Sequence, residues 1–182
     1  MGKIKKTTAL IAPSAKMLGA KTLGTSGSAA KLEKLKAIGL DVAIETRGAD
    51  FADKVKAATG GAGADLVVNL VGGTQFAECV RCLARHGRLA VVGYVDGSVK
   101  AELDLSAVHV NRLEIFGISN AKLTAEEKAA ATRGFVRDVV PAIADGRIVP
   151  VVDRVFAFDE LPQAKAHMEA SAMVGKIVVR VA

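Results

Sequence analysis

Two near-continuous apolar runs constrain the fold of this chain more than any other feature of its sequence. They are ADLVVNLV at residues 64–71 and RLAVVGY at residues 88–94. A run without polar alternation predicts a strand buried on both faces, and such strands occur in parallel sheets that are covered by helices. The composition, 51% hydrophobic with only 4% aromatic residues, fits an aliphatic core of this kind. We therefore expect an α/β domain in which helices connect parallel strands.

The segments around these runs alternate between strand-like and helix-like patterns. We expect further strands at 21–25, 42–46 and 112–118. We expect helices at 7–18, 29–38, 50–58, 75–85 and 124–146. Asp50 should cap its helix, Thr124 and Glu127 have the spacing of a capping box, and Pro141 should bend or split the last helix. This order predicts a Rossmann-like, doubly wound parallel sheet, with ligands at the carboxyl ends of its strands.

The sequence changes character near residue 149. Segment 151–156 is predicted to be extended, 159–169 to be helical, and 175–181 to form a closing strand. We therefore expect a Rossmann-like domain at 1–148 and a C-terminal extension at 149–182.

The segment TLGTSGSAAK at residues 22–31 carries the clearest indication of a ligand. It places a strand end, a small polar turn and a helix start where a dinucleotide-binding sheet reads the adenosine ribose. An acidic residue there would favour NAD, but this segment has none. Ser26, Ser28 and Lys31 offer hydroxyls and a cation, which suit a 2′-phosphate and predict NADP(H). The alternative is that Ser28 only caps the helix and that Lys31 is solvated.

Charge and hydropathy exclude several classes of partner. The formal net charge is +6, but basic residues are spread along the chain, and the sequence has one Tyr and no Trp. We therefore expect no nucleic-acid partner. No apolar run reaches the ~20 residues needed to span a bilayer. No export signal follows the basic start, so a cytoplasmic location without membrane contact is expected.

Cys79 and Cys82 form a C-x-x-C pair within an expected helix. A structural zinc site needs about four ligands, and no second such pair or His pair follows, so we expect no metal. The sequence also contains no nucleophile elbow and no phosphate-binding Walker loop. The catalytic residues are therefore unknown at this point.

Four segments together carry a resemblance to one family. They are AKMLGAKTLGTSGSAAKLEKLKAIGLDVAI (15–44), TGGAGADLVVNLVGG (59–73), GRLAVVGY (87–94) and FDELPQAKAHMEASAMVGKIVV (158–179). With these segments in this order, the chain resembles the medium-chain dehydrogenase/reductase superfamily, in particular its quinone oxidoreductase-like and zinc-type alcohol dehydrogenase branch. The resemblance implies an NADP(H)-dependent oxidoreductase that transfers hydride to a quinone, an enone or another small carbonyl compound. It also implies a homodimer in which the strand at 113–119 pairs with its copy.

The resemblance implies further cofactor contacts. Arg47 stands where the family places contacts to the adenosine phosphate. Near the nicotinamide end, the family's contacts fall on Asn69, Val71, Gly72, Gly93, Tyr94, Gly117 and Ser119. Two plainer interpretations stay open: residues 69–72 can be an ordinary strand-to-helix turn, and Tyr94 can be a packing residue rather than a proton donor.

Two departures from the family pattern support a second hypothesis. The sequence lacks the N-terminal GroES-like substrate domain, and it has no glycine-rich turn before Leu10. That turn lets backbone N–H groups approach the pyrophosphate. The first strand is also expected to be truncated, which should lower the stability and favour dimerisation. The alternative function is therefore a catalytically inactive, truncated dinucleotide-binding or dimerisation module.

Overall fold

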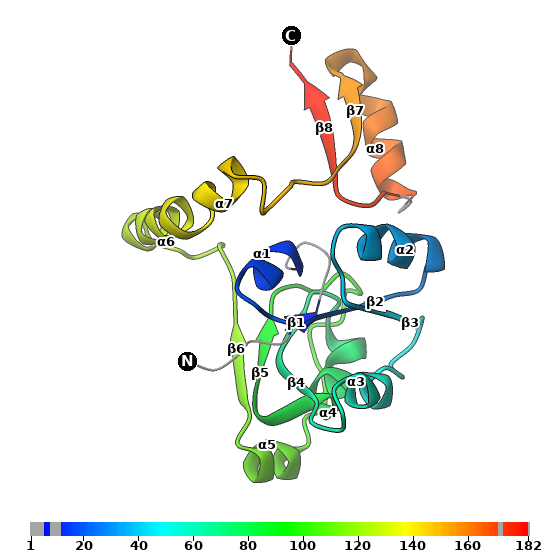
Figure 1. Cartoon of the computed structure of the whole chain (residues 1–182), viewed down its shortest axis with the longest axis vertical. Helices are drawn as coiled ribbons and strands as arrows, with labels where there is room; N and C mark the ends of the chain where they lie inside the picture. The colour runs from blue at the N-terminus through cyan, green and yellow to red at the C-terminus, as the bar shows by residue number, and fades with distance from the viewer. Residues whose placement is uncertain (1–5, 8–11, 171–172, 182) are drawn as a thin grey trace.

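The computed structural model describes residues 6–7, 12–170 and 173–181. Two three-stranded parallel sheets, with the orders β1–β2–β3 and β4–β5–β6, form its centre. β1 lies against β4, so the six strands follow one another across the molecule (Figure 1). The strands are β1 (Lys6–Thr7), β2 (Thr22–Ser26), β3 (Val42–Glu45), β4 (Ala64–Asn69), β5 (Leu83–Val91) and β6 (Glu114–Gly117). The order 3-2-1-4-5-6 is that of a Rossmann-like, doubly wound sheet, and the predicted fold class is confirmed.

Helices lie on both sides of these strands. They are α1 (Ala12–Met17), α2 (Ala29–Ala37), α3 (Ala52–Ala58), α4 (Phe76–Arg81) and α5 (Leu105–Asn111). Figure 1 shows α1 and α2 on one side, and α3, α4 and α5 on the other. The main hydrophobic core lies between the strands and α3 and α4, and it includes Leu23, Val55 and Leu89. Helices on both faces explain why the central strands are continuous apolar runs.

The beginning of the chain differs in part from the prediction. Thr7, expected in a helix, belongs to β1, which pairs in parallel with Thr22 and Leu23 of β2. β1 therefore occupies the central position of the sheet with two described residues. The expected helix begins only at Ala12. The place of the glycine-rich turn, between β1 and α1, lies outside the described residues.

The prediction of a helix at 75–85 is wrong at its C-terminal end. A 3-10 turn, η1 (Gly73–Gln75), leads into α4, but the chain is already extended at Leu83, where β5 begins. Leu83 pairs with Ala64 of β4 and is buried, so strand pairing overrides the local helical pattern. β5 ends at Val91, three residues before the predicted end.

The predicted cap of α3 is also wrong. Asp50 does not cap the backbone of the helix; its carboxylate accepts a hydrogen bond from the Thr46 hydroxyl and pairs with the Lys54 side chain of α3 at 3.4 Å. Instead, the Glu78 carboxylate on α4 accepts a hydrogen bond of 2.8 Å from the N–H of Ala52, the first residue of α3. Glu78 also pairs with Arg81. A buried acid from a neighbouring helix therefore satisfies the amide that a local cap would have taken.

Helix α5 was not predicted: the expected strands at 88–94 and 112–118 had no helix between them. Asp104 is its N-cap and accepts a hydrogen bond of 3.0 Å from the N–H of Ala107. The predicted capping box is confirmed, since Thr124 and Glu127 bond reciprocally at the start of the next helix. That helix is split near Pro141, as predicted, into α6 (Ala125–Asp138) and α7 (Val140–Ala144).

The last described part is a small β–α–β unit, which we call the C-terminal unit. It consists of β7 (Val152–Ala157), η2 (Phe158–Glu160), α8 (Leu161–Glu169) and β8 (Lys176–Arg180), with β7 and β8 parallel. The predicted extended, helical and extended segments are confirmed. Val174 of this unit is 8% exposed and packs with Leu32, Leu35 and Leu40 at α2. The C-terminal unit is therefore anchored on the helix that follows β2 (Figure 1).

Candidate functional site

A pocket with a volume of about 560 Å³, which we call the main pocket, opens at the carboxyl ends of β2, β3 and β4. Its lining is Thr25, Ser26, Gly27, Thr46, Arg47, Gly48, Phe51, Val55, Ala64, Val67, Val68, Asn69, Leu70, Val71, Gln75, Cys79 and Cys82. In a doubly wound sheet this is the edge at which ligands bind.

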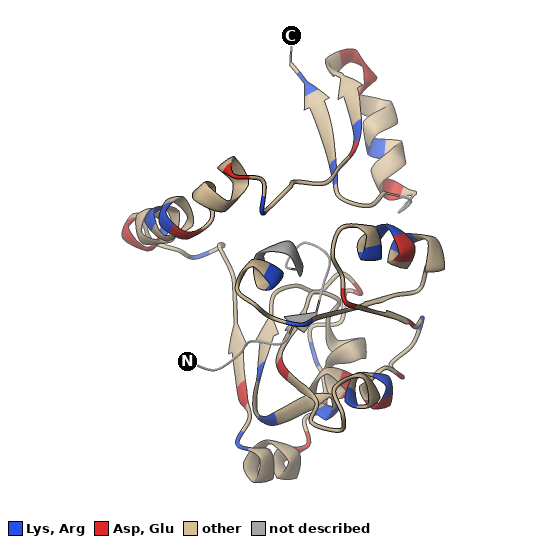
Figure 2. Ribbon diagram, in the orientation of Figure 1, with Lys and Arg blue, Asp and Glu red and all other residues tan. Residues whose placement is uncertain are grey.

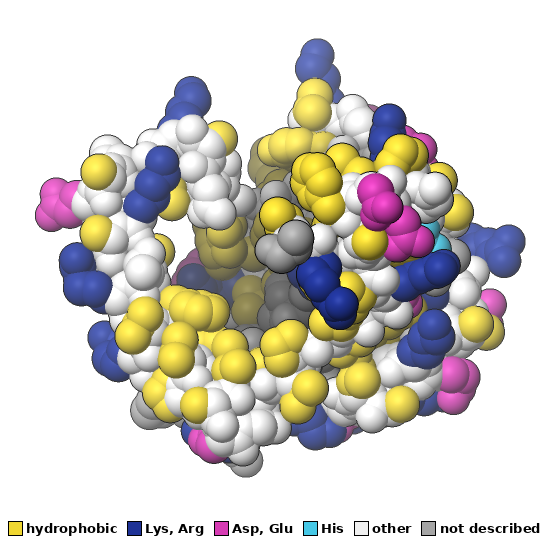
Figure 3. Space-filling model, turned by 90° about the horizontal axis from the view of Figure 1, so that it is seen from above, with side chains coloured by type: hydrophobic (Ala, Val, Ile, Leu, Met, Phe, Trp, Pro, Cys, Tyr) yellow, Lys and Arg dark blue, Asp and Glu magenta, His cyan; other side chains and the backbone are white. Residues whose placement is uncertain are grey.

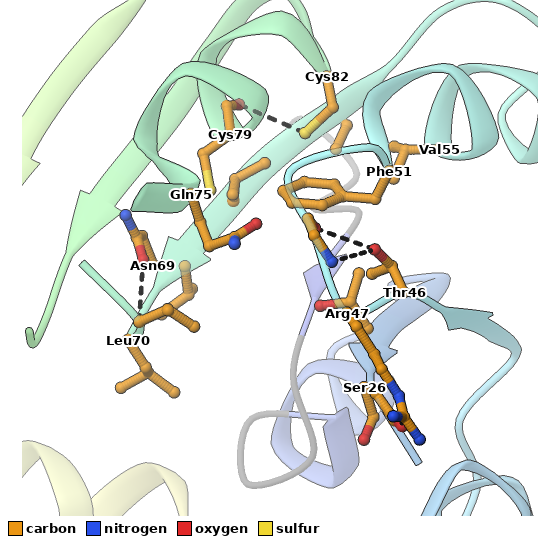
Figure 4. Close-up of a pocket in the computed structure, with 17 residues that line it drawn as sticks. Ser26, Thr46, Arg47, Phe51, Val55, Asn69, Leu70, Gln75, Cys79 and Cys82 are labelled. Atoms are coloured by element: carbon orange, nitrogen blue, oxygen red, sulfur yellow. Dashed lines mark hydrogen bonds between the residues drawn. The ribbon is translucent and has the colours of Figure 1, made fainter. Parts of the chain in front are cut away.

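One end of the main pocket is polar. Ser26 ends β2, and Arg47 follows β3; Figure 4 shows their side chains next to each other at this end. The Arg47 guanidinium donates a hydrogen bond of 3.1 Å from Nε to the carbonyl of Gly27. A Cβ at Gly27 would lie 2.9 Å from Cγ of Arg47, so glycine allows this close approach. The turn therefore holds a guanidinium beside the Ser26 hydroxyl.

The other end of the main pocket is apolar and lies between α3 and α4. Phe51, Cys79 and Cys82 gather there in Figure 4. Both cysteines are buried and form no disulfide. Burial raises the pKa of each thiol to about 12, so both stay protonated at neutral pH. Cys82 donates a hydrogen bond of 3.3 Å to the carbonyl of Cys79, which makes the pair a packing element of the pocket wall.

Asn69 is a buried residue that shapes the turn after β4. Its Oδ1 accepts hydrogen bonds from the N–H groups of Val71 (2.9 Å) and Gly72 (3.0 Å). Its Nδ2 donates to the carbonyl of Gly72 at 2.9 Å. Gly72 has a φ of +127°, a conformation that side-chain-bearing residues rarely adopt. Asn69 therefore lines the main pocket while its amide supports the backbone of the turn.

A second pocket, which we call the lysine pocket, adjoins Ser26 at the start of α2. It has a volume of about 500 Å³ and is lined by Ser26, Gly27, Ser28, Ala30, Lys31, Lys34 and Val174. Figure 2 shows that α2 carries mostly basic charged residues. Ser28 is the N-cap of α2, and its hydroxyl accepts a hydrogen bond of 3.4 Å from the N–H of Lys31. The interpretation of Ser28 as a cap is thus confirmed, and its phosphate-binding role stays a prediction.

Some of the predicted site residues line a pocket, and others lie outside both pockets. Ser26, Arg47, Asn69 and Val71 line the main pocket, and Ser26, Ser28 and Lys31 line the lysine pocket. The other predicted residues line neither pocket but lie in or just after β4, β5 and β6 at the same edge of the sheet: Gly72, Gly93, Tyr94, Gly117 and Ser119. Tyr94 is 55% exposed.

Sequence reasoning missed several lining residues. Lys34 lies one helical turn after Lys31, so the K-x-x-K spacing could have indicated it. Phe51, immediately before α3, gave no comparable signal. Val174 could not have been found from local sequence, because it reaches the lysine pocket from the C-terminal unit.

The described residues offer neither a metal site nor a membrane span. Among them, no group of three or more His, Cys, Asp and Glu side chains could hold a metal ion. His167, which lies in the family-like segment at 158–179, is 2.8 Å from the Asp153 carboxylate. Within the same described part, no helix is long and apolar enough to cross a membrane.

A family model described as "Zinc-binding dehydrogenase" matches residues 9–134. The chain belongs to this family. It forms the C-terminal, cofactor-binding part of a medium-chain dehydrogenase/reductase, as the sequence motifs predicted. The family name implies zinc, but the described residues do not fit a zinc site.

Curated relatives of this chain are longer proteins. A phenolphthiocerol/phthiocerol polyketide synthase of Mycobacterium tuberculosis is 30% identical over 167 residues, which are 92% of this chain and 8% of that protein. Quinone oxidoreductase-like protein 2 of Bos taurus is 24% identical over 94% of this chain and 48% of its own length. The chain thus spans only part of the curated relatives that it matches.

Solved structures agree with the fold and the family. A mycobacterial protein complexed with NADPH has a TM-score of 0.79 and 25% identity, over 99% of this chain and 58% of that one. An NAD-dependent alcohol dehydrogenase has a TM-score of 0.75 and 26% identity, over 98% and 51%. The neighbours therefore include proteins of both cofactor types, and the family to which this chain belongs is one of oxidoreductases.

Proposed function

We propose that this chain is the NADP(H)-binding part of a zinc-independent, quinone oxidoreductase-like enzyme. The observation that carries the proposal is the lysine pocket, in which Ser26, Ser28 and Lys31 adjoin the main pocket at the end of β2. Among the residues that the structure describes, no acidic side chain lines either pocket. The donor set of hydroxyls and a cation fits a 2′-phosphate and not a bare 2′-hydroxyl.

Different residues would hold the two ends of this cofactor. Ser26 and Arg47 would hold the adenosine end in the main pocket, where an apolar wall adjoins a guanidinium. The turns after β4, β5 and β6 would hold the nicotinamide end, and their Gly72, Gly93 and Gly117 allow close backbone approach. NADPH, when bound, supplies the hydride, so the chain itself needs to bind, orient and exclude water.

A second candidate function is a dinucleotide-binding or dimerisation module without catalysis. It is favoured by the sequence between Gly2 and Gly19, which contains no glycine to bring the backbone close to a pyrophosphate. The substrate of the first candidate, a quinone, an enone or another carbonyl compound, also needs residues beyond this chain. Binding without turnover would support this second function.

The cofactor proposal predicts preferential binding of NADPH over NADH. In a fluorescence titration of the full chain, Lys31→Met should weaken NADPH about tenfold and leave NADH unchanged, because a charge-assisted contact to phosphate is lost. Lys36→Met is the matched control, since Lys36 lies on the same helix, pairs with Glu33 and does not line the lysine pocket. Tighter binding of NADH than of NADPH by the unmodified chain would contradict the proposal.

We also propose a homodimer formed through β6. This strand is the last of its sheet and pairs with β5 on one side. Ile118, which directly follows this strand, is an exposed apolar residue, as are Leu105 and Val110 of α5, the preceding helix. Pairing with a second copy would cover both the strand edge and these side chains. Sedimentation equilibrium should give twice the chain mass, and a monomer mass unchanged by a hundredfold increase in concentration would rule the dimer out.

The C-terminal extension at 149–182 is proposed to pack on a substrate domain. Apolar side chains of β7, η2, α8 and β8 are exposed, including Val152, Val155, Phe158, Leu161 and Val178. Figure 3 shows hydrophobic side chains around a hollow between the α6–α7 side and the C-terminal unit. A two-stranded sheet with so much exposed apolar surface is only marginally stable by itself.

We also propose a cytoplasmic location for the protein. The free thiols of Cys79 and Cys82 support it, because cysteines stay reduced in that compartment.

A further inference from the structure

Lys34 stands at the boundary between the lysine pocket and the C-terminal unit. It lines the pocket one turn after Lys31, and its side chain is 62% exposed. Its Nζ lies 4.0 Å from Oδ1 of Asp153, at the outer limit of an ion pair. An ion pair with such an exposed lysine is weak, so the ammonium can move at little cost.

Asp153 is held much more firmly than Lys34. Its side chain is 12% exposed, its Oδ2 lies 2.8 Å from Nε2 of His167, and its Oδ1 accepts a hydrogen bond of 3.0 Å from the N–H of Val174. The hydrogen bond with His167 holds the pKa of the Asp153 carboxyl below its usual value. Val174 packs on α2 and forms one wall of the lysine pocket. A fixed negative charge therefore stands just outside the pocket.

We propose that Lys34 is a specificity-determining residue for the 2′-phosphate, shared between that phosphate and Asp153. This inference rests on the proposed NADP(H) function. Lys31 and Lys34 line the same pocket from one face of α2, so a phosphate between them meets two cations. A phosphate dianion attracts the flexible Lys34 ammonium more strongly than one carboxylate does. Through Asp153, the C-terminal unit lowers the affinity for the phosphate.

The test compares 2′,5′-ADP with 5′-AMP by calorimetry on the full chain, because these probes differ only in the 2′-phosphate. Lys34→Met should weaken 2′,5′-ADP about fivefold and leave 5′-AMP unchanged. Lys36→Met, on the same helix but outside the pocket, should change neither probe. Asp153→Asn keeps an acceptor for the Val174 N–H and should strengthen 2′,5′-ADP about threefold, since the competing charge is gone.

The outcomes separate the role of Lys34 from the function on which it rests. If the unmodified chain binds 2′,5′-ADP no better than 5′-AMP, the NADP(H) preference and the role of Lys34 both fail. If that preference exists and Lys31→Met weakens 2′,5′-ADP while Lys34→Met leaves its affinity unchanged, only the role of Lys34 is overturned. If Lys34→Met weakens 2′,5′-ADP but Asp153→Asn, still folded by circular dichroism, has no effect, sharing with Asp153 is overturned. If Asp153→Asn loses its structure, Lys34→Met alone supports or overturns the role of Lys34.

Discussion

Gly63→Ala is expected to lower the free energy of unfolding by about 3–4 kcal/mol, because two costs add at one position. Gly63 has a φ of +84°, in the left-handed region that disfavours a side chain. A Cβ there would also lie 2.8 Å from three backbone atoms: the N of Ala84, the O of Cys82 and the C of Leu83. Leu83 and Ala84 begin β5, which pairs with β4, and the carbonyl of Cys82 accepts a hydrogen bond of 2.9 Å from the N–H of Ala64, so these atoms cannot move aside cheaply. Urea denaturation followed by circular dichroism measures the loss.

Gly61→Ala is the matched control for this prediction. Gly61 has a nearly equal φ of +87°, but a Cβ there would have nothing within 4 Å. This substitution should therefore cost only the backbone strain, about 1–2 kcal/mol. Equal losses for the two variants would show that the close approach of residue 63 to β5 contributes nothing.

Glu78→Ala is expected to cost about 3 kcal/mol, because it leaves buried groups without partners. Glu78 is 5% exposed, and its carboxylate accepts a hydrogen bond of 2.8 Å from the N–H of Ala52. Ala52 is fully buried. Truncation removes that acceptor from the start of α3 and also removes the ion pair with Arg81. Thermal or urea unfolding of the variant measures the effect.

Two substitutions make the Glu78 experiment specific. Glu78→Gln keeps an acceptor for the Ala52 N–H and should recover a large part of the loss. Asp50→Ala should cost less than about 0.5 kcal/mol, because this exposed carboxylate does not cap α3. A larger loss from Asp50→Ala than from Glu78→Ala would mean that the local cap, and not the buried acid, stabilises the helix.

The elements that sequence patterns predicted correctly depend on near neighbours. The apolar run at 64–71 predicted β4, and the Thr124–Glu127 spacing predicted the start of α6. Two of the failures occurred where distant residues compete with local preference. Leu83 is extended because it pairs with Ala64, and the α3 amide is taken by Glu78, 26 residues away.

The candidate site also combines residues that are close in sequence with residues that are far apart in the chain. Ser26, Ser28 and Lys31 share one strand end and one helix start, so their proximity follows from a few consecutive residues. Lys34 belongs to the same face of α2 by helical periodicity. Nothing near Lys34 in sequence indicates Asp153 or Val174, which come from a unit more than 100 residues later.

The sequence by itself determined the alternation of strands and helices, the helix caps built from adjacent residues, and the small polar turn that suits a phosphate. These follow from backbone geometry and from side chains within one or two turns of each other. Only the tertiary structure decided which acid caps α3, how the main pocket is closed by α4, and which charges surround the lysine pocket. Those features depend on where segments far apart in the chain meet, and a burial pattern along one segment says only that a side chain is covered, not by what.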